Sequence, residues 1–277
     1  MKDNKKIDTS YWDNRRNKIF SSKGGWLIGK GAYSHEYDIN KDCVGEISYF
    51  QLMILNAIGR LPEKRLADWL EATFMGVSWP DSRIWCNQIA ALGGTMRSSA
   101  AAAVSAGLLA ADTRLYAQKS LIEGMAFIQA ALKKKLSGMT PEEIVAEKCS
   151  QNGGKPYISG YARPIAKGDE RIAPLEKLST KLNFNNGEHL ELAYEIEKVL
   201  MKKYNEGMNL GGYVSAFLAD RGLTKEEAYR ICIISTNSGI LACYTDTVIR
   251  PPESFLPLRC DDIDYQGPPP REVPNPD

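Results

Sequence analysis

The sequence predicts a nearly all-α fold, on three observations. Apolar residues recur at helical spacing, as they do at Leu52, Leu55 and Ile58. Threonine–glutamate pairs at two places have the spacing of a helix start, with Thr140 and Thr224 as the first residues. No run of residues alternates convincingly between apolar and polar, which is the pattern typical of a strand.

The first half of the chain gives three helical segments. Residues 46–59 form one apolar stripe, and the turn at residues 59–62 (Gly-Arg-Leu-Pro) ends it. Pro62 suits the first turn of a second helix over 63–75. Residues 89–111 are rich in Ala, Gly and Ser and are expected as one helix. Side chains this small let another helix approach closely, inside the protein or at a subunit contact, although the high helix propensity of alanine accounts for them equally well.

The second half continues the helical pattern. Capping boxes at 140–143 and 224–227 begin two helices, and leucine stripes over 175–182 and 190–200 mark two more. A loop rich in turn-forming residues precedes position 158. The tail over 251–277 is rich in proline and is expected to be extended.

Composition excludes several classes of protein. The 277 residues suffice for one large domain or two unequal lobes. A formal net charge of +1, with 25% charged and 43% apolar residues, gives no sign of nucleic-acid or anionic-membrane binding. No apolar run reaches the roughly 20 residues that span a bilayer, and no apolar segment follows the basic start, so we expect a cytoplasmic protein without a secretory signal.

Cysteine and histidine usage predicts no metal site. The six cysteines form no C-x-x-C pair, so free buried thiols are expected, Cys243 and Cys260 included. The two histidines, His35 and His189, are too few for a histidine-rich metal centre, and structural or surface roles are expected for them.

The segment 158–171 (ISGYARPIAKGDER) carries most of the functional information. It resembles the active-site signature of the citrate synthase and citryl-CoA lyase family, in which a G-[FY]-[GA]-H-P loop binds coenzyme A and a following D-P-R supplies an arginine. Other segments before and after it match motifs of the family in the same order along the chain. They are Gly59–Pro62, the small residues near 89–117, Asn209–Gly212 and Tyr265–Pro268. Together with residues 36–50, the resemblance covers roughly residues 33–270.

The resemblance implies a citrate-synthase-like two-lobed helical fold. Residues 1–117 and 226–277 would form the large lobe, and 118–225 an inserted small lobe that carries the CoA-type loop. It also implies a homodimer with a C-terminal residue contributed across the dimer. A polycarboxylate and coenzyme A or an acyl-CoA would be co-substrates, with no cofactor bound permanently.

The family's catalytic residues are replaced at three positions. Arg114 and Arg163 stand where the family has histidines, and Gly211 stands at the position of an aspartate. Arginine cannot act as a general base at neutral pH, but it can stabilise an enolate or oxyanion. Arg114 and Arg163 are therefore candidate catalytic residues, with Asp112 as a candidate proton acceptor. Tyr161, Tyr213 and Glu123 are unranked alternatives for that acceptor.

The binding residues that the resemblance implies are better preserved. Gly160, Tyr161, Ala162 and Lys167 match the part of the loop that contacts coenzyme A. Candidate substrate-binding residues are Arg171, Arg259 and Asn209, and a guanidinium fork suits bidentate capture of a carboxylate.

Three functions fit these residues. The first is an acyltransferase or lyase that forms or cleaves a C–C bond between an acyl-CoA and a keto or polycarboxylic acid, with an active site rebuilt around arginine. The second is an inactive citrate-synthase-like pseudoenzyme that binds a polyanion, its arginines pairing with carboxylates of the chain. The third keeps the fold but takes an anionic substrate other than CoA.

Overall fold

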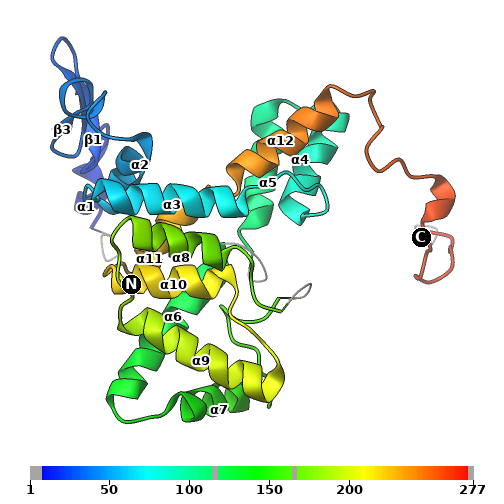
Figure 1. Cartoon of the computed structure of the whole chain (residues 1–277). Coiled ribbons are helices and arrows are strands. Elements are labelled where there is room, and N and C mark those ends of the chain that lie inside the picture. The colour runs from blue at the N-terminus through cyan, green and yellow to red at the C-terminus, as the bar shows by residue number, and fades with distance from the viewer. Residues whose placement is uncertain (1–7, 114–117, 164–166, 274–277) are drawn as a thin grey trace, which may run out of the picture. The chain divides into compact units, whose positions relative to one another are not determined.

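The computed structural model describes residues 8–113, 118–163 and 167–273. Contacts divide the chain into two compact units, unit 1 with residues 1–76 and 117–233, and unit 2 with residues 77–116 and 234–277. The described residues are mostly helical, and the predicted all-α class is confirmed (Figure 1). The predicted lobe boundaries, 1–117 with 226–277 and 118–225, stay a prediction.

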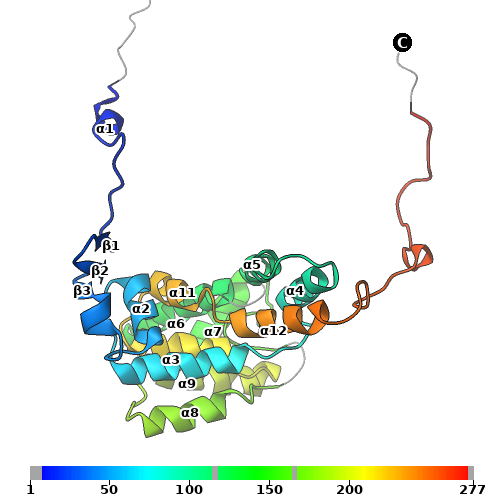
Figure 2. The ribbon, with the colours of Figure 1, turned by 90° about the horizontal axis from the view of Figure 1, so that it is seen from above.

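Unit 1 consists of helices with a small sheet at the N-terminal end (Figures 1 and 2). Its elements are α1 (Ser10–Asp13), β1 (Gly24–Leu27), β2 (Gly31–Ser34), β3 (Tyr37–Asp38), a π-helical turn (Ile39–Cys43), α2 (Tyr49–Ile58), α3 (Lys64–Val77), α6 (Gln118–Leu136), α7 (Pro141–Gln151), α8 (Ile172–Lys181), α9 (Glu188–Tyr204), α10 (Leu210–Asp220) and α11 (Lys225–Cys232).

Helix α10 forms the centre of unit 1, and nearly all of its side chains are buried. It contacts α6 and α9. Phe217 of α10 stacks on Trp69 of α3, with ring centroids 3.8 Å apart. The indole of Trp69 donates to Ser179 Oγ of α8 at 2.9 Å, so the buried N–H of this large side chain is satisfied. A buried α10 is a rigid support for whatever packs against its first turn.

Both predicted capping boxes are confirmed. The side chains of Thr140 at the start of α7 and Thr224 at the start of α11 each accept from the backbone amide three residues on. The carboxylates of Glu143 and Glu227 accept in turn from the backbone amides of these threonines. Glu227 also pairs with Arg60, with Nη1 and Oε1 2.6 Å apart. The predicted helices over 46–59 and 63–75 correspond to α2 and α3, each with slightly different ends.

The antiparallel sheet β1-β2-β3 is a feature that the sequence did not predict. Its strands have two to four residues, too few for a visible alternation, and β1 is exposed along its whole length. Gly24 is required in β1, because a Cβ there would lie 2.1 Å from the carbonyl oxygen of Tyr33.

Unit 2 contains α4 (Trp85–Thr95), α5 (Ala100–Ala111), α12 (Asn237–Val248) and a short 3-10 helix at Cys260–Asp262. The prediction of one helix over 89–111 was wrong, because the chain turns between α4 and α5. Arg97 adopts a left-handed conformation (φ 60°) and Ser99 caps α5 through the amide of Ala102.

The small residues of α4 and α5 allow close helix packing, as predicted. A Cβ on Gly93 would lie 2.5 Å from Cβ of Ala103, and one on Gly107 would lie 2.7 Å from Cγ2 of Ile240 in α12. No larger residue fits at either position without moving a helix. These glycines therefore serve packing within unit 2.

Beyond α12, the described tail over 251–273 is exposed and has little regular structure, as its prolines predict (Figure 2). Cys43, Cys86, Cys149, Cys232 and Cys243 are free and buried, whereas Cys260 in the tail is exposed. The expectation of a buried Cys260 was therefore wrong, because the tail has no core around it.

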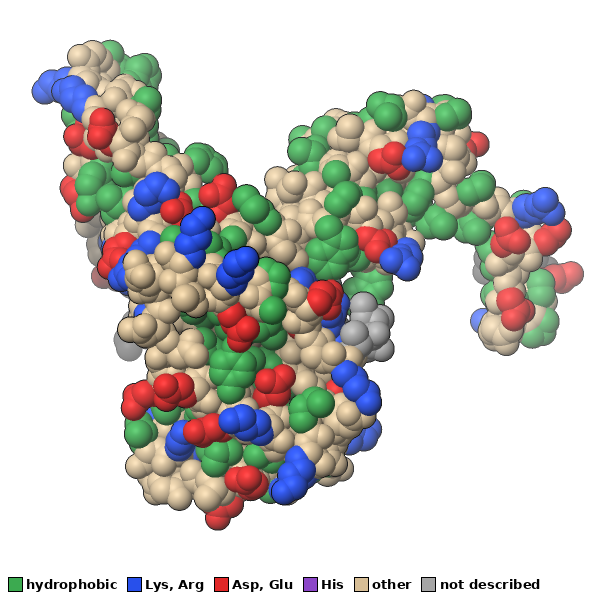
Figure 3. All heavy atoms as spheres, in the orientation of Figure 1, with side chains coloured by type: hydrophobic (Ala, Val, Ile, Leu, Met, Phe, Trp, Pro, Cys, Tyr) green, Lys and Arg blue, Asp and Glu red, His purple; other side chains and the backbone are tan. Residues whose placement is uncertain are grey.

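The described surface agrees with the balanced composition. Over the helices of unit 1, Figure 3 shows acidic and basic side chains interspersed rather than gathered by sign. Within the described ranges, no helix is both long enough and apolar enough to cross a membrane.

Candidate active site

Residues 158–171, called here the signature loop, pack against the start of α10. Tyr161 forms an isolated antiparallel bridge with Met208. The amide of Ala162 donates to the carbonyl of Gly207 at 2.8 Å, and the amide of Asn209 donates to that of Gly160 at 3.0 Å. Residues 164–166 lie outside the described residues. The first half of the loop is therefore fixed by backbone hydrogen bonds to the segment that leads into α10.

The glycines of this contact are needed for a close backbone approach. Gly160 has φ 98°, and a Cβ on it would lie 2.8 Å from Cα of Gly212. A Cβ on Gly212 would lie 2.2 Å from the carbonyl oxygen of Gly160. Ala162 also has a positive φ, 72°. The Gly-Tyr-Ala unit thus follows a path that few other residues tolerate.

Asn209 joins the loop to the helix. Its side-chain oxygen accepts from the amide of Gly212 at 3.2 Å and caps α10, while its side-chain nitrogen donates to the carbonyl of Ala162 at 2.9 Å. Both ends of the amide therefore have structural partners. The capping role could have been found in the sequence, because Asn209 directly precedes an apolar helix.

Asp169 is the buried centre of an ion-pair cluster. Its side chain is 0% exposed, and Arg171 donates to it through Nε at 2.7 Å and Nη2 at 2.5 Å. The amide of Leu210, in the first turn of α10, donates to Oδ2 at 2.9 Å. Burial alone would raise the pKa of Asp169, but these hydrogen bonds and the Arg171 charge outweigh it and hold the pKa below its usual value. Asp169 is therefore an ionised anchor between the loop and α10.

The Asp-x-Arg spacing alone does not define this anchor. Asp81 and Arg83 form the same two-residue unit in unit 2, with Nε–Oδ1 and Nη2–Oδ2 distances of 3.1 and 2.7 Å. There the arginine side chain is 91% exposed, against 22% for Arg171. Arg83 lowers the pKa of Asp81 to about 2, yet solvent screens this pair. Burial and the contact with α10 distinguish Asp169.

Arg163, the residue at the family's histidine position, pairs with Glu170. Its Nη1 and Nη2 lie 2.5 and 3.3 Å from the two oxygens of Glu170, and Nη1 lies 3.6 Å from Oδ1 of Asp169. The Glu170 hydrogen bonds raise the pKa of Arg163, and those from Arg163 lower the pKa of Glu170. The sequence did not assign a role to Glu170, because a contact across seven residues of irregular loop has no periodic signal.

Solved structures share the fold of this chain. The chain is similar to the structure of citryl-CoA lyase from Hydrogenobacter thermophilus, with a TM-score of 0.78 and 25% identity over 93% of this chain and 98% of that one. The resemblance to the citrate synthase and citryl-CoA lyase family is confirmed. No family model and no curated protein matches the sequence.

Two other similar structures support the family fold. ATP citrate lyase from Methanothrix soehngenii, solved in complex with citrate and coenzyme A, gives a TM-score of 0.75 at 17% identity over 94% of this chain and 44% of that one. Citrate synthase from Thermoplasma acidophilum, in a ternary complex with carboxymethyl coenzyme A and oxaloacetate, gives 0.61 at 18% identity, over 82% and 58%. At these identities the likeness concerns the fold.

Within this citrate-synthase-like fold, two candidate proton acceptors lie in the core. The hydroxyl of Tyr161 donates to the carbonyl of Ala193 at 3.0 Å, and burial raises its pKa. Tyr213 is buried as well, 3.3 Å from Ser179 Oγ, and burial raises its pKa too. A buried phenol with a raised pKa is a poor base, so neither fits that role.

Glu123 stays open as a proton acceptor. Its Oε2 accepts from Ser159 Oγ at 2.8 Å, which places the carboxylate beside the signature loop. Lys167, on the other side of the undescribed residues, is exposed. Its role in binding coenzyme A stays a prediction, as do those of Gly160 and Ala162.

The remaining predicted site residues belong to unit 2 or are not described. Asp112 caps the C-terminal end of α5 and is half-buried. Arg259 lies in the exposed tail, where its amide donates to Asp262 Oδ2 at 2.7 Å. Arg114 lies outside the described residues. A common site for Arg114, Asp112, Arg259 and the signature loop therefore stays a prediction.

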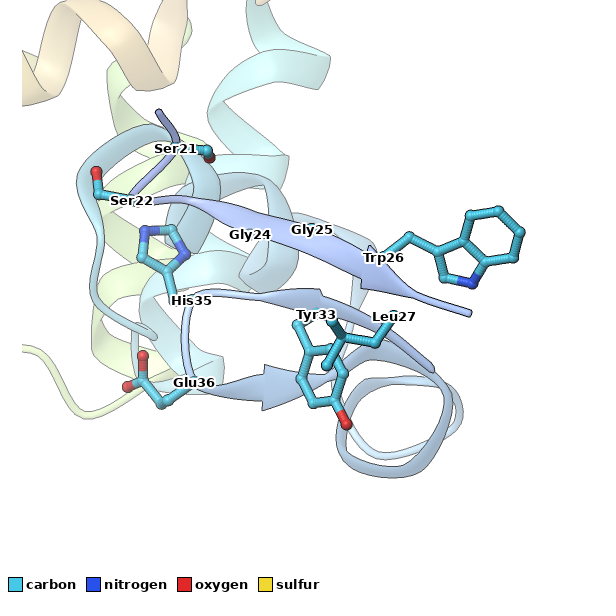
Figure 4. Close-up of a pocket in the computed structure, with 9 residues that line it drawn as sticks. All are labelled: Ser21, Ser22, Gly24, Gly25, Trp26, Leu27, Tyr33, His35 and Glu36. Carbon is cyan, nitrogen blue, oxygen red and sulfur yellow. The ribbon is translucent and has the colours of Figure 1, made fainter. Parts of the chain in front are cut away.

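A groove beside the small sheet of unit 1 carries none of the predicted site residues. It is an open groove of about 500 Å³ beside β1 and β2 (Figure 4). Trp26 points away from the sheet in this view, while His35 lies near Ser22. Among the described residues, Nε2 of His35 is buried without a hydrogen-bond partner. The lining residues are Ser21, Ser22, Gly24, Gly25, Trp26, Leu27, Tyr33, His35 and Glu36.

Proposed function

We propose that the chain is a citrate-synthase-like acyltransferase or lyase. It would form or cleave a C–C bond between an acyl-CoA and a keto or polycarboxylic acid. The observation that carries the proposal is the fixed signature loop. Both guanidinium groups pair with Asp169, which the amide of Leu210 in α10 holds, and the Gly160–Ala162 backbone is bonded to residues 207–209. The likeness to a citryl-CoA lyase along nearly the whole length of both chains supports it.

The loop would bind coenzyme A through its backbone. Gly160 and Ala162 have small side chains, and backbone hydrogen bonds to residues 207–209 fix the path of the main chain that the ligand would contact. Lys167, an exposed cation, would pair with a phosphate of the ligand. Coenzyme A or an acyl-CoA would thus be a co-substrate.

Arginine would supply the electrostatic part of the chemistry. Cleaving or forming a bond next to a thioester develops negative charge on the thioester oxygen. Arg114 would donate a hydrogen bond to that oxygen in place of a family histidine, and the charge of Arg163 would stabilise the same developing charge while its fork holds an anionic group of the ligand. The raised pKa of Arg163 keeps its guanidinium charged and excludes it as a base.

The other residues would bind the acid and move the proton. Arg171 and Arg259 are the proposed substrate-binding residues, with Arg259 contributed by the second subunit of a homodimer. Asn209, whose side-chain amide is bonded to Ala162 and Gly212, would hold the loop in place around the acid. Asp112 is the proposed proton acceptor. The protein would act in the cytoplasm.

A pseudoenzyme that binds a polyanion is the second candidate. The observation in its favour is that Arg163 and Arg171 are both paired with carboxylates of their own loop. In a cleft that no longer catalyses a reaction, arginines can pair with carboxylates of the chain in the same way.

A turnover assay separates the two candidates. Purified protein is incubated with citryl-CoA, and in the other direction with acetyl-CoA and a panel of keto-diacids, and the thioesters are followed by mass spectrometry. We expect product from the intact chain, and its loss in Arg163→Ala but not in the matched exposed control Arg83→Ala. Consumption of no acyl-CoA in either direction would leave the pseudoenzyme as the better account.

A further inference from the structure

We propose that Glu170 occupies the position on Arg163 that an anionic group of the ligand takes, so that ligand binding exchanges one carboxylate for another. This inference rests on the proposed function, because it concerns the same loop. It assigns Glu170 as a residue that sets affinity and selects for ligands able to replace it.

The contact has the geometry of ligand recognition. Both terminal nitrogens of Arg163 reach the two oxygens of one carboxylate, which is how guanidinium forks bind carboxylates and phosphates. The Arg163 side chain is 13% exposed, whereas that of Glu170 is 71% exposed. Glu170 can therefore move into water at little cost, while Arg163 stays in place.

The neighbouring carboxylate cannot exchange in this way. The side chain of Asp169 is fully buried and is held by Arg171 and by the amide of Leu210. It also lies 3.6 Å from Nη1 of Arg163, so it keeps that guanidinium oriented after Glu170 has left. The cluster thus has one fixed carboxylate and one displaceable one.

Charge balance explains why an anion would be drawn in. Among the described residues that these ion pairs join, two arginines and two acidic residues carry equal and opposite formal charges. When Glu170 turns outward, one positive charge remains beside the fixed loop. A ligand with a pair of anionic oxygens restores neutrality, and we commit to a carboxylate of a polycarboxylic acid, with a phosphate of coenzyme A as the other source of the same chemistry.

Removing the charge of Glu170 should tighten binding. While Glu170 occupies Arg163, a ligand cannot bind there, so the apparent affinity for the ligand falls with the fraction of molecules in which this pair is formed. For a pair with one exposed partner, we expect Glu170→Gln to bind citrate about two- to fivefold more tightly than the intact chain. Glu142→Gln, which removes an exposed carboxylate in the first turn of α7, controls for net charge.

A double-mutant cycle provides the test. Citrate, inorganic phosphate and coenzyme A are titrated calorimetrically into the intact chain, Glu170→Gln, Arg163→Ala and the double variant. The proposal requires that Glu170→Gln increases the affinity for the ligand, and that this increase disappears when Arg163 is also replaced by alanine. A gain for citrate alone identifies the carboxylate source, and a gain for phosphate or coenzyme A alone identifies the phosphate source.

Other results overturn the inference. An unchanged or weakened affinity in Glu170→Gln, with normal melting temperature and with weaker binding in Arg163→Ala, would refute the exchange but keep the proposed function. A gain that persists without Arg163, or that Glu142→Gln reproduces, would show a general charge effect. If no variant binds any probe, both this inference and the proposed function fail.

Discussion

The substitution Asp169→Asn tests whether the buried ion-pair cluster holds the signature loop on α10. The amide is nearly isosteric with the carboxylate, but it carries no charge and turns a donor towards Arg171 or the amide of Leu210. The best control is Asp81→Asn. Asp81 makes the same bidentate contact with an arginine two residues on, and Arg83 is largely exposed.

The magnitude follows from burial. Removing one partner of a fully buried ion pair costs about 3–5 kcal/mol. Arg171 is 22% exposed and Arg163 13% exposed, so water compensates part of the loss, and we expect about 2–3 kcal/mol. For Asp81→Asn the loss should be at most about 1 kcal/mol. At about 2–4 °C per kcal/mol, the melting temperature should fall by about 4–12 °C in the first variant and clearly less in the second.

Thermal unfolding followed by circular dichroism, with urea titration as a second method, measures both variants. If Asp169→Asn is no less stable than Asp81→Asn, the cluster contributes nothing beyond a surface ion pair. The structural basis for Arg163 as an anchored residue would then be lost.

Three further predictions concern other parts of the account. Gly160→Ala should destabilise the protein and weaken ligand binding, since its Cβ would meet Gly212. The control Gly153→Ala, also at positive φ but with open space around its Cβ, should lower the free energy of unfolding by only about 1 kcal/mol. Equal losses of stability in the two variants would contradict the close approach of Gly160 to Gly212. Folding lowers the pKa of Asp169, so its contribution to the free energy of unfolding is complete above about pH 4 and is lost as pH falls further. Below that pH, the urea midpoint should therefore drop more steeply in the intact chain than in Asp169→Asn. A thiol reagent should label Cys260 rapidly in the native protein and the other cysteines only after denaturation; rapid labelling of a second thiol would contradict the burial.

Local signals allowed most of the helices to be predicted. Thr140 and Thr224 mark helix starts because their capping boxes are complete within four residues. The break between α4 and α5 was missed, although Ser99 before a run of alanines is a capping signal, because alanine favours helix on both sides. The strands near Gly24 were missed because they are too short to alternate.

The candidate site residues were named from a resemblance, and their functional role stays a prediction. The resemblance located the loop and named Arg163 and Arg171, but the contacts that fix them are long-range. The hydrogen bond from the amide of Leu210 to Asp169 joins residues 41 positions apart. The side chain of Tyr161 is buried, and its hydroxyl donates to the carbonyl of Ala193 in α9. Partners this distant cannot be read from spacing along a single sequence.

The measurement that tests the central claim most directly is calorimetric titration of the purified protein with coenzyme A and acetyl-CoA, repeated with Arg163→Ala and Lys167→Ala. The account predicts micromolar binding, about −8 kcal/mol, that weakens in both variants. Absence of binding to the intact chain would contradict it, since a loop that no longer takes coenzyme A cannot support acyl-CoA chemistry.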